Sequence, residues 1–244
     1  MYLKFVLKMR LCVIWCMCYY STLFLHVASF KLNEFGAFSL VFDTRLSWPI
    51  FVIYIVCCTF TFLDAYHLLI IGQGAVRFIE DIQAFMLLIF AVFTYSYMQP
   101  LKLAKGEKYF WLWAVCWWLV LFGRSTSWGR DYFPQVPKIY FRSISVVLIG
   151  SVLFSLFNPY LRQEIARKFK SVSISIWAVI MVILGFVISD SIEHERMLGV
   201  LFLHQHENRD FMEEIYEFPL IVGLFVIAFN VMKMDKTKFN MLRR

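Results

Sequence analysis

The chain has 244 residues, of which 61% are apolar and 19% aromatic, while only 17% are charged. A water-soluble domain of this size could not bury so much apolar surface, so the composition excludes that class and predicts a membrane protein. The net charge of +7 does not indicate nucleic-acid binding, because Lys and Arg lie in short loops and at the chain ends rather than on one basic face. Membrane lipids are therefore the expected partners.

Seven apolar segments are long enough to cross about 30 Å of hydrocarbon as helices. In chain order they are 11–30, 49–72, 81–98, 109–123, 139–160, 173–189 and 215–232. The linkers are short, which favours antiparallel packing of sequence neighbours. We therefore predict an all-α polytopic bundle of about seven spans, with residues 1–244 forming a single integral membrane domain and no soluble domain. The basic start of the chain resembles a signal peptide, but no small-residue cleavage pattern follows, which favours a retained first helix.

The distribution of cations predicts the orientation in the membrane. Three basic groups fall on one side of a seven-span model: Lys102, Lys105 and Lys108; Arg162, Arg167, Lys168 and Lys170; and Lys233, Lys236, Lys238, Arg243 and Arg244. The positive-inside rule makes that side and the C-terminus cytoplasmic, as in a bacterial inner membrane. A six-span alternative, in which 49–72 does not cross, would keep the basic N-terminus on the same side.

A cluster of ionisable residues lies between the last two predicted spans. Positions 189–217 hold eight of the 17 carboxylates and three of the five histidines. On the opposite side from the basic groups, these residues would meet polar residues of the other spans. Glu80 and Asp81, like Glu213 and Glu214, are expected to open helices, where the helix dipole favours carboxylates.

Three residues of this cluster are the candidate catalytic groups, because neither solvent nor a helix dipole explains them. Asp190 and His194 are four residues apart and would share a helix face, so the carboxylate could orient the imidazole. Glu217 lies inside an apolar segment, where an ionised group is costly and needs a partner or a water-filled cavity.

Three further polar residues fall within the predicted spans. Asp64 and His67 lie toward the outer end of the second span, and Arg142 near the start of the fifth. Arg142 is a plausible counter-charge for Asp64 and Glu217. An interhelical salt bridge is the purely structural alternative to a chemical role.

The segment 124–134, with sequence RSTSWGRDYFP, is the most motif-like part of the chain. Gly129 permits a tight turn, and Trp128 suits a membrane interface. Arg124 and Arg130 offer paired donors for phosphate or carboxylate, so these three side chains, Arg124, Trp128 and Arg130, form a candidate anion-binding site.

No metal or cofactor is predicted. The six cysteines lie within apolar runs, and no His or Cys set has a firm ligand spacing. His204 and His206, with Glu207 beside them, leave a divalent-metal alternative open, although loop histidines are more often solvated.

Two short motifs resemble those of a group of uncharacterised bacterial multi-pass membrane proteins. In that group a helix with an acidic start precedes a helix that ends in a Ser-Trp-Gly-Gln or Ser-Trp-Gly-Arg turn. This chain is similar at 80–84 (EDIQA) and 127–130 (SWGR), and again at 213–217 (EEIYE). It differs where relatives carry acidic residues before the turn, since it has Arg124, Ser125 and Thr126 there. The resemblance implies a helical membrane protein and no particular activity.

A second resemblance, to seven-span hydrolases similar to alkaline ceramidases, is weaker. His67, Asp190 and His194 invite that comparison, but 215–232 contains no histidine pair.

Three functions are compatible with the sequence. The first is a structural or accessory membrane component that docks membrane-protein partners on its outward polar surface. The second is an enzyme acting on a lipid or lipid-linked substrate, with Asp190, His194 and Glu217 as acid–base groups. The third is a transporter of a small solute or ion that uses Asp64 and Glu217, which the missing internal repeat disfavours.

Overall fold

The computed structural model describes residues 42–44, 47–69, 71, 74–130, 132–196 and 198–242. The first predicted span, 11–30, lies outside them. Seven helices make up most of the described part: α2 (Trp48–Ala65), α3 (Ala75–Met98), α4 (Lys105–Ser125), α5 (Lys138–Ser155), α6 (Pro159–Ser171), α7 (Ile176–Glu193) and α8 (Arg209–Leu242). Two-residue strands β1 (Phe42–Asp43) and β2 (Ile174–Ser175) pair in parallel.

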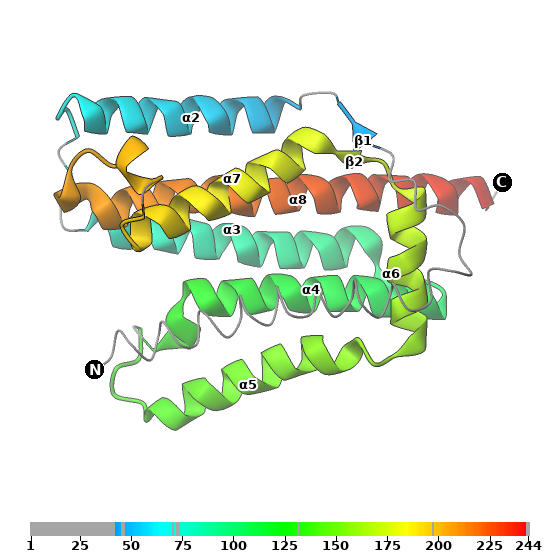
Figure 1. The fold of residues 1–244 in the computed structure, drawn as a ribbon. Coiled ribbons are helices and arrows are strands. Elements are labelled where there is room, and N and C mark those ends of the chain that lie inside the picture. The colour runs from blue at the N-terminus through cyan, green and yellow to red at the C-terminus, as the bar shows by residue number, and fades with distance from the viewer. Residues whose placement is uncertain are drawn as a thin grey trace. The chain divides into compact units, whose positions relative to one another are not determined.

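The long helices run alongside one another (Figure 1). The most extensive contact joins α7 to α8; α8 also contacts α2 and α3, α3 contacts α4, and α4 contacts α5. Helix α6 is the exception, since it runs across the others and contacts α4. The fold is therefore all-α, as the composition predicts.

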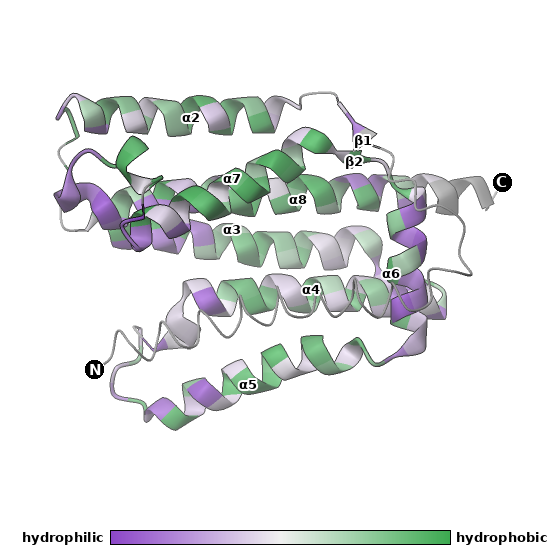
Figure 2. Cartoon of the chain, in the orientation of Figure 1, coloured by the Kyte–Doolittle hydropathy of each residue, from purple (hydrophilic) through white to green (hydrophobic). Residues whose placement is uncertain are grey.

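Four of the described helices are long and apolar enough to cross a membrane. They are α2, α5, α7 and the segment His206–Thr237, which includes most of α8. Helices α3 and α4 coincide with two further predicted spans, but their first turns are more polar and they are not among the four. Figure 2 shows apolar residues along the middle of the long helices and polar residues near their ends.

Two predictions about where helices begin and end are wrong. The predicted span 139–160 is interrupted, because α5 ends at Ser155 and α6 begins at Pro159. Proline restricts the residue before it to extended backbone, and the side chain of that residue, Asn158, caps α6 by accepting from the amide of Tyr160 at 3.0 Å. The basic segment taken for a loop is therefore a helix.

The second correction concerns the carboxylates expected to open helices. Helix α3 begins at Ala75 and α8 at Arg209, so the pairs 80–81 and 213–214 lie in the second turn rather than the first. The helix dipole falls off within the first turn. It therefore explains Asp210, in the first turn of α8, better than the four carboxylates to which it was applied.

Helices α7 and α8 approach closely because of small residues. A Cβ on Gly185 of α7 would lie 2.8 Å from the backbone nitrogen of Leu220 and 2.9 Å from Cβ of Pro219. A Cβ on Gly223 of α8 would lie 3.1 Å from the carbonyl oxygen of Ala178. Small residues at such crossings are typical of membrane helices, whose association depends on close packing.

Aromatic side chains fill the layer between α3, α4 and α8. Phe90 and Phe225 stack with centroids 3.9 Å apart, and Trp118 meets Phe90 edge-on at 5.5 Å. Leu87 and Ile221 are buried beside them. This packing fixes α3, α4 and α8 relative to one another, and so determines where their ends lie.

The helices end in two regions of different character. The polar end is where α2, α4 and α7 finish and α3, α5 and α8 begin. The basic end is where α4 and α7 begin, α3, α5 and α8 finish, and α6 crosses. The three cation groups predicted to share one side meet at the basic end, as far as the structure describes them.

Candidate functional site

The polar end collects the residues that the sequence singles out. Asp64, Arg124 and Asp190 lie in the last turns of α2, α4 and α7, and Glu217 lies in the third turn of α8. Their partners differ, so each is described in turn.

Asp64 is fully buried, and protein donors surround its carboxylate. Its Oδ2 accepts from the backbone amides of His204 at 2.7 Å and Gln205 at 3.3 Å, and its Oδ1 accepts from Asn208 Nδ2 at 2.7 Å. Gln205 Nε2 also donates to the Asp64 carbonyl oxygen at 2.9 Å. A buried carboxylate is tolerated only when it is satisfied in this way. Asp64 therefore fastens the segment before α8 to the end of α2.

The segment 194–208, called the docking loop below, joins α7 to α8. Arg209 Nη1 pairs with Glu195 Oε1 at 3.2 Å, and a Cβ on Gly199 would lie 2.6 Å from the carbonyl oxygen of Ser191. The loop is thus tied at Asp64, at Arg209 and against the end of α7. It nevertheless exposes three apolar side chains: Leu198 (48%), Val200 (71%) and Leu201 (64%).

Asp190 and His194 lie one turn apart, because α7 continues past the predicted end at Ser189 to Glu193 and His194 caps it. His194 Nδ1 is 3.5 Å from Asp190 Oδ1 and 3.1 Å from the Asp190 carbonyl oxygen. Arg196, which the sequence did not single out, donates a short hydrogen bond to Asp190 Oδ2. The carboxylate is therefore already paired with a guanidinium.

Glu217 has a cation of α4 beside it. Arg124 Nη2 lies 3.7 Å from Glu217 Oε1, linking α4 to α8. Arg142, the predicted counter-charge, is exposed on α5. The interhelical pair supports the structural interpretation of Glu217.

The turn 127–129 reverses the chain after α4. Ser127, Trp128 and Gly129 all have positive φ, at 48°, 60° and 90°. This backbone lays the Trp128 ring directly on Gly123, where a Cβ would lie 2.4 Å from Cζ3 of the indole. Trp128 thus covers the end of α4. The backbone amide of Arg130 donates a hydrogen bond to the Ser127 carbonyl oxygen and so closes the turn.

Asp81 contributes to a further contact at the polar end. The phenol of Tyr132 donates a short hydrogen bond to Asp81, and this bond raises the pKa of Tyr132. Arg77 lies over the Tyr132 ring, 5.7 Å from its centroid. His67 is exposed after the end of α2, with φ of 55°.

No group of three or more potential ligands suited to a metal ion occurs among the described residues. His204 Nδ1 is 3.7 Å from Asp64, whereas His206 is 83% exposed and 4.0 Å from Glu195. The two histidines therefore have different neighbours.

The candidate residues make three sets of contacts. Asp64 is hydrogen-bonded to the docking loop, Asp190 lies beside His194 and Arg196, and Arg124 pairs with Glu217. Sequence reasoning missed Gln205, Asn208 and Arg196, which are the partners of Asp64 and Asp190. Asn208 directly before a helix beginning at Arg209 is a common helix-start residue, and that was the available signal.

The chain matches no protein-family model, no curated protein and no solved structure. The class of protein is therefore defined by the chain itself: an all-α protein whose described part has four helices long and apolar enough to span a membrane.

Proposed function

We propose that this chain is a structural or accessory component of a membrane assembly, and that the docking loop at its polar end binds a membrane-protein partner. The observation that carries the proposal is the combination of a fastened backbone and exposed apolar side chains. Leu198, Val200 and Leu201 protrude from a loop that Asp64 and Arg209 hold in place. Binding residues are often found on loops positioned by a rigid scaffold, and clustered exposed apolar residues mark interaction sites.

The proposed arrangement in the membrane follows from the charges. The basic end would face the cytoplasm and the polar end the outside of a bacterial inner membrane. We propose seven spans, in which α3 and α4 cross in addition to the four apolar helices. The seventh is the predicted span 11–30, which lies outside the described residues, and six spans are the alternative. Charged first turns of α3 and α4 would then lie at the two interfaces.

The test is site-specific photo-crosslinking in cells that make the protein naturally. A photoreactive residue replaces Val200 in the docking loop or, as control, Val147. Val147 is 64% exposed on α5, which is long and apolar enough to cross a membrane. We expect a discrete protein adduct from position 200 that the control does not form. Leu198→Ser with Leu201→Ser should abolish that adduct without lowering the unfolding temperature. Equal adducts from both positions, or none from position 200, would contradict the proposal.

An enzyme acting on a lipid or lipid-linked substrate is the second candidate. The 3.5 Å approach of His194 to Asp190 favours it, because a carboxylate can fix the imidazole tautomer for proton transfer. Glu217 would serve as acid, and Arg124 and Arg130 would hold an anionic headgroup. The pairing of Arg124 with Glu217 and of Arg196 with Asp190 supports the docking function instead.

One substitution distinguishes the two candidate functions. His194→Ala removes the proposed proton-transfer group and leaves the docking loop's apolar residues in place. Under the docking function, the variant restores the wild-type lipid profile and phenotype in a deletion strain. Failure to restore them, with a normal amount of folded protein and a normal adduct from position 200, would favour the enzyme.

A further inference from the structure

Helix α6 has two faces of opposite character. Leu161, Glu164, Ile165 and Lys168 are buried, whereas the intervening positions are largely exposed. This spacing of three and four residues is that of an amphipathic helix. Because α6 crosses the ends of the long helices (Figure 1), it is oriented as a helix lying in the membrane interface would be.

A buried ionic network fixes α6 to its neighbours. Lys168 forms a short ion pair with Asp235 of α8, which also accepts from Trp111 Nε1 of α4 at 2.9 Å. Lys168 Nζ is also 3.3 Å from Glu164 Oε1. The position and tilt of α6 are therefore set by contacts with both α4 and α8.

The carboxylates of α4, α6 and α8 at this end pair with cations of α6. Arg167 donates hydrogen bonds to Glu107 at 2.8 Å and to Glu164 at 2.9 Å. The hydrogen bond to Glu164 raises the pKa of Arg167. Lys168 forms an ion pair with Asp235. Each of these three carboxylates therefore already has a cation of α6 as its partner.

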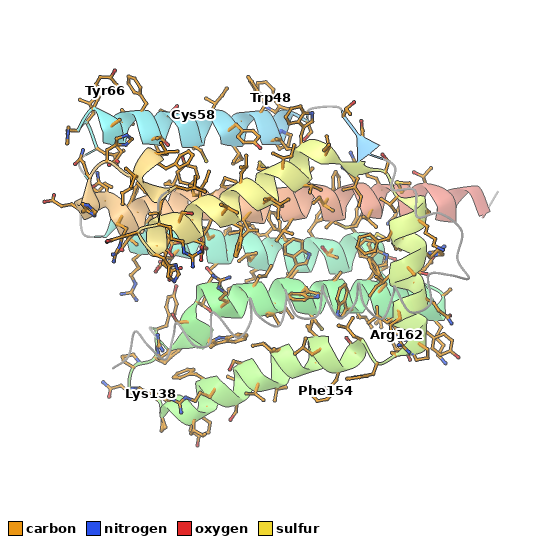
Figure 3. The ribbon with its side chains drawn as sticks, in the orientation of Figure 1. Trp48, Cys58, Tyr66, Lys138, Phe154 and Arg162 are labelled. Atoms are coloured by element: carbon orange, nitrogen blue, oxygen red, sulfur yellow. The ribbon has the colours of Figure 1, made fainter. Side chains whose placement is uncertain are left out.

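Two cations among the described residues of the basic end lack such a carboxylate partner. Within the described part of the chain, Lys102 and Arg162 are exposed and their side chains make no hydrogen bond or ion pair. Lys105 lies over the Tyr160 ring at 4.2 Å, which places it beside the start of α6. Figure 3 shows Arg162 extending from the part of α6 nearest α5.

Exposed aromatic side chains accompany these cations. Phe157 is 72%, Tyr160 46% and Phe169 43% exposed, at the start of α6 and on its outer face. Aromatic rings beside Lys and Arg are typical of the headgroup region, where the rings meet acyl chains and the cations meet phosphates.

We propose that α6, with the start of α4 and the turn Pro100–Lys102 before it, forms a binding surface for anionic lipid headgroups, in which Lys102, Lys105 and Arg162 contact the phosphates. The bilayer supplies the ligand, and the buried pair between Lys168 and Asp235 holds the surface at the depth of the headgroups. The surface lies at the opposite end of the long helices from the docking loop, so its failure would leave the docking proposal unaffected.

The test measures lipid affinity by native mass spectrometry of the full chain in an uncharged detergent. Phosphatidylglycerol is titrated against wild type and the triple variant Lys102→Gln, Lys105→Gln, Arg162→Gln. Each cation near such a surface contributes several-fold, so we expect binding on the order of a hundredfold weaker at low salt. Added salt should narrow the difference by screening. Phosphatidylcholine should bind both proteins equally.

A matched control removes the same charge from the polar end: Arg77→Gln, Lys138→Gln, Arg142→Gln. Retained phosphatidylglycerol affinity in the control supports the proposal, and an equal loss in both variants would overturn it as an effect of net charge. Glycerol phosphate is the competitor that distinguishes a lipid from a soluble anion. Displacement of the lipid by a similar concentration of glycerol phosphate would also overturn the proposal.

Discussion

Asp64 and Asn208 are 144 residues apart in the sequence, yet Asn208 Nδ2 donates a 2.7 Å hydrogen bond to Asp64 Oδ1 in the interior of the polar end. The same carboxylate accepts two backbone amides of the docking loop. One buried side chain therefore determines how the chain enters α8, and through it the position of the loop's exposed apolar residues.

Asp64→Asn should loosen the docking loop. The amide group would place an NH2 against a backbone N–H or against Asn208, and a buried unsatisfied donor costs about 1–3 kcal/mol. We expect a lower unfolding temperature and faster proteolysis between residues 195 and 208, measured on the purified protein in detergent.

Asp210→Asn is the matched control for this substitution. The Asp210 side chain is 70% exposed and pairs with its neighbour Arg209. An exposed pair contributes little, so the control should unfold and be cleaved as wild type. Similar protease sensitivity of Asp64→Asn and wild type would show that Asp64 does not hold the loop.

Lys168→Met should detach α6 from α8. The substitution leaves Asp235 ionised with its principal cation removed, and breaking a buried pair costs about 3–5 kcal/mol. Adding Asp235→Leu should recover part of the loss, because the unpaired charge is then gone. Thermal unfolding of the single and double variants measures this. A double variant less stable than Lys168→Met would contradict the pairing argument.

The helices of the fold were largely predictable from sequence, whereas α6 was not. Each described span prediction contains a helix, because runs of apolar residues leave few alternatives, although 139–160 also includes the break between α5 and α6. In α6 the apolar positions Leu161 and Ile165 are separated by charged residues, so a test for apolar length passes over it. The signal was present in Asn158 and Pro159, a capping residue before a proline at the first helical position.

The sequence predicted that the candidate residues lie at one end of the helices, but it did not predict which residues contact one another. Helix directions were enough to place Asp64, Arg124 and Asp190 at one end. They could not identify partners, because these come from irregular backbone such as the docking loop. Asp64 accepts hydrogen bonds from backbone amides, which almost every residue has, so no pattern of residue types predicts that contact.

Gly123→Ala should displace the Trp128 ring. The new methyl group would lie 2.4 Å from the indole, and forcing atoms into a packed site costs about 1–3 kcal/mol. In the double variant Gly123→Ala, Trp128→Ala the clash is absent, so its stability should match that of Trp128→Ala alone or exceed it. Chemical or thermal unfolding provides the measurement.

Gly150→Ala in α5 is the control for Gly123→Ala. Its Cβ would meet Phe154 at 3.7 Å, an ordinary contact, and alanine favours a helix over glycine. We expect unchanged or slightly raised stability. If both glycine variants behave alike, close packing of Trp128 on Gly123 is not what stabilises the turn.

Glu217→Gln distinguishes a structural pair from a catalytic acid. Arg124 and Glu217 are 39% and 21% exposed and 3.7 Å apart, so the pair should contribute no more than about 1 kcal/mol to stability. We expect a small fall in the unfolding temperature and full complementation of a deletion strain. The exchange Arg124→Glu with Glu217→Arg preserves opposite charges and should also complement. Loss of function in Glu217→Gln at wild-type stability would require a chemical role for this carboxylate, since removing a weak ion pair cannot by itself produce that loss.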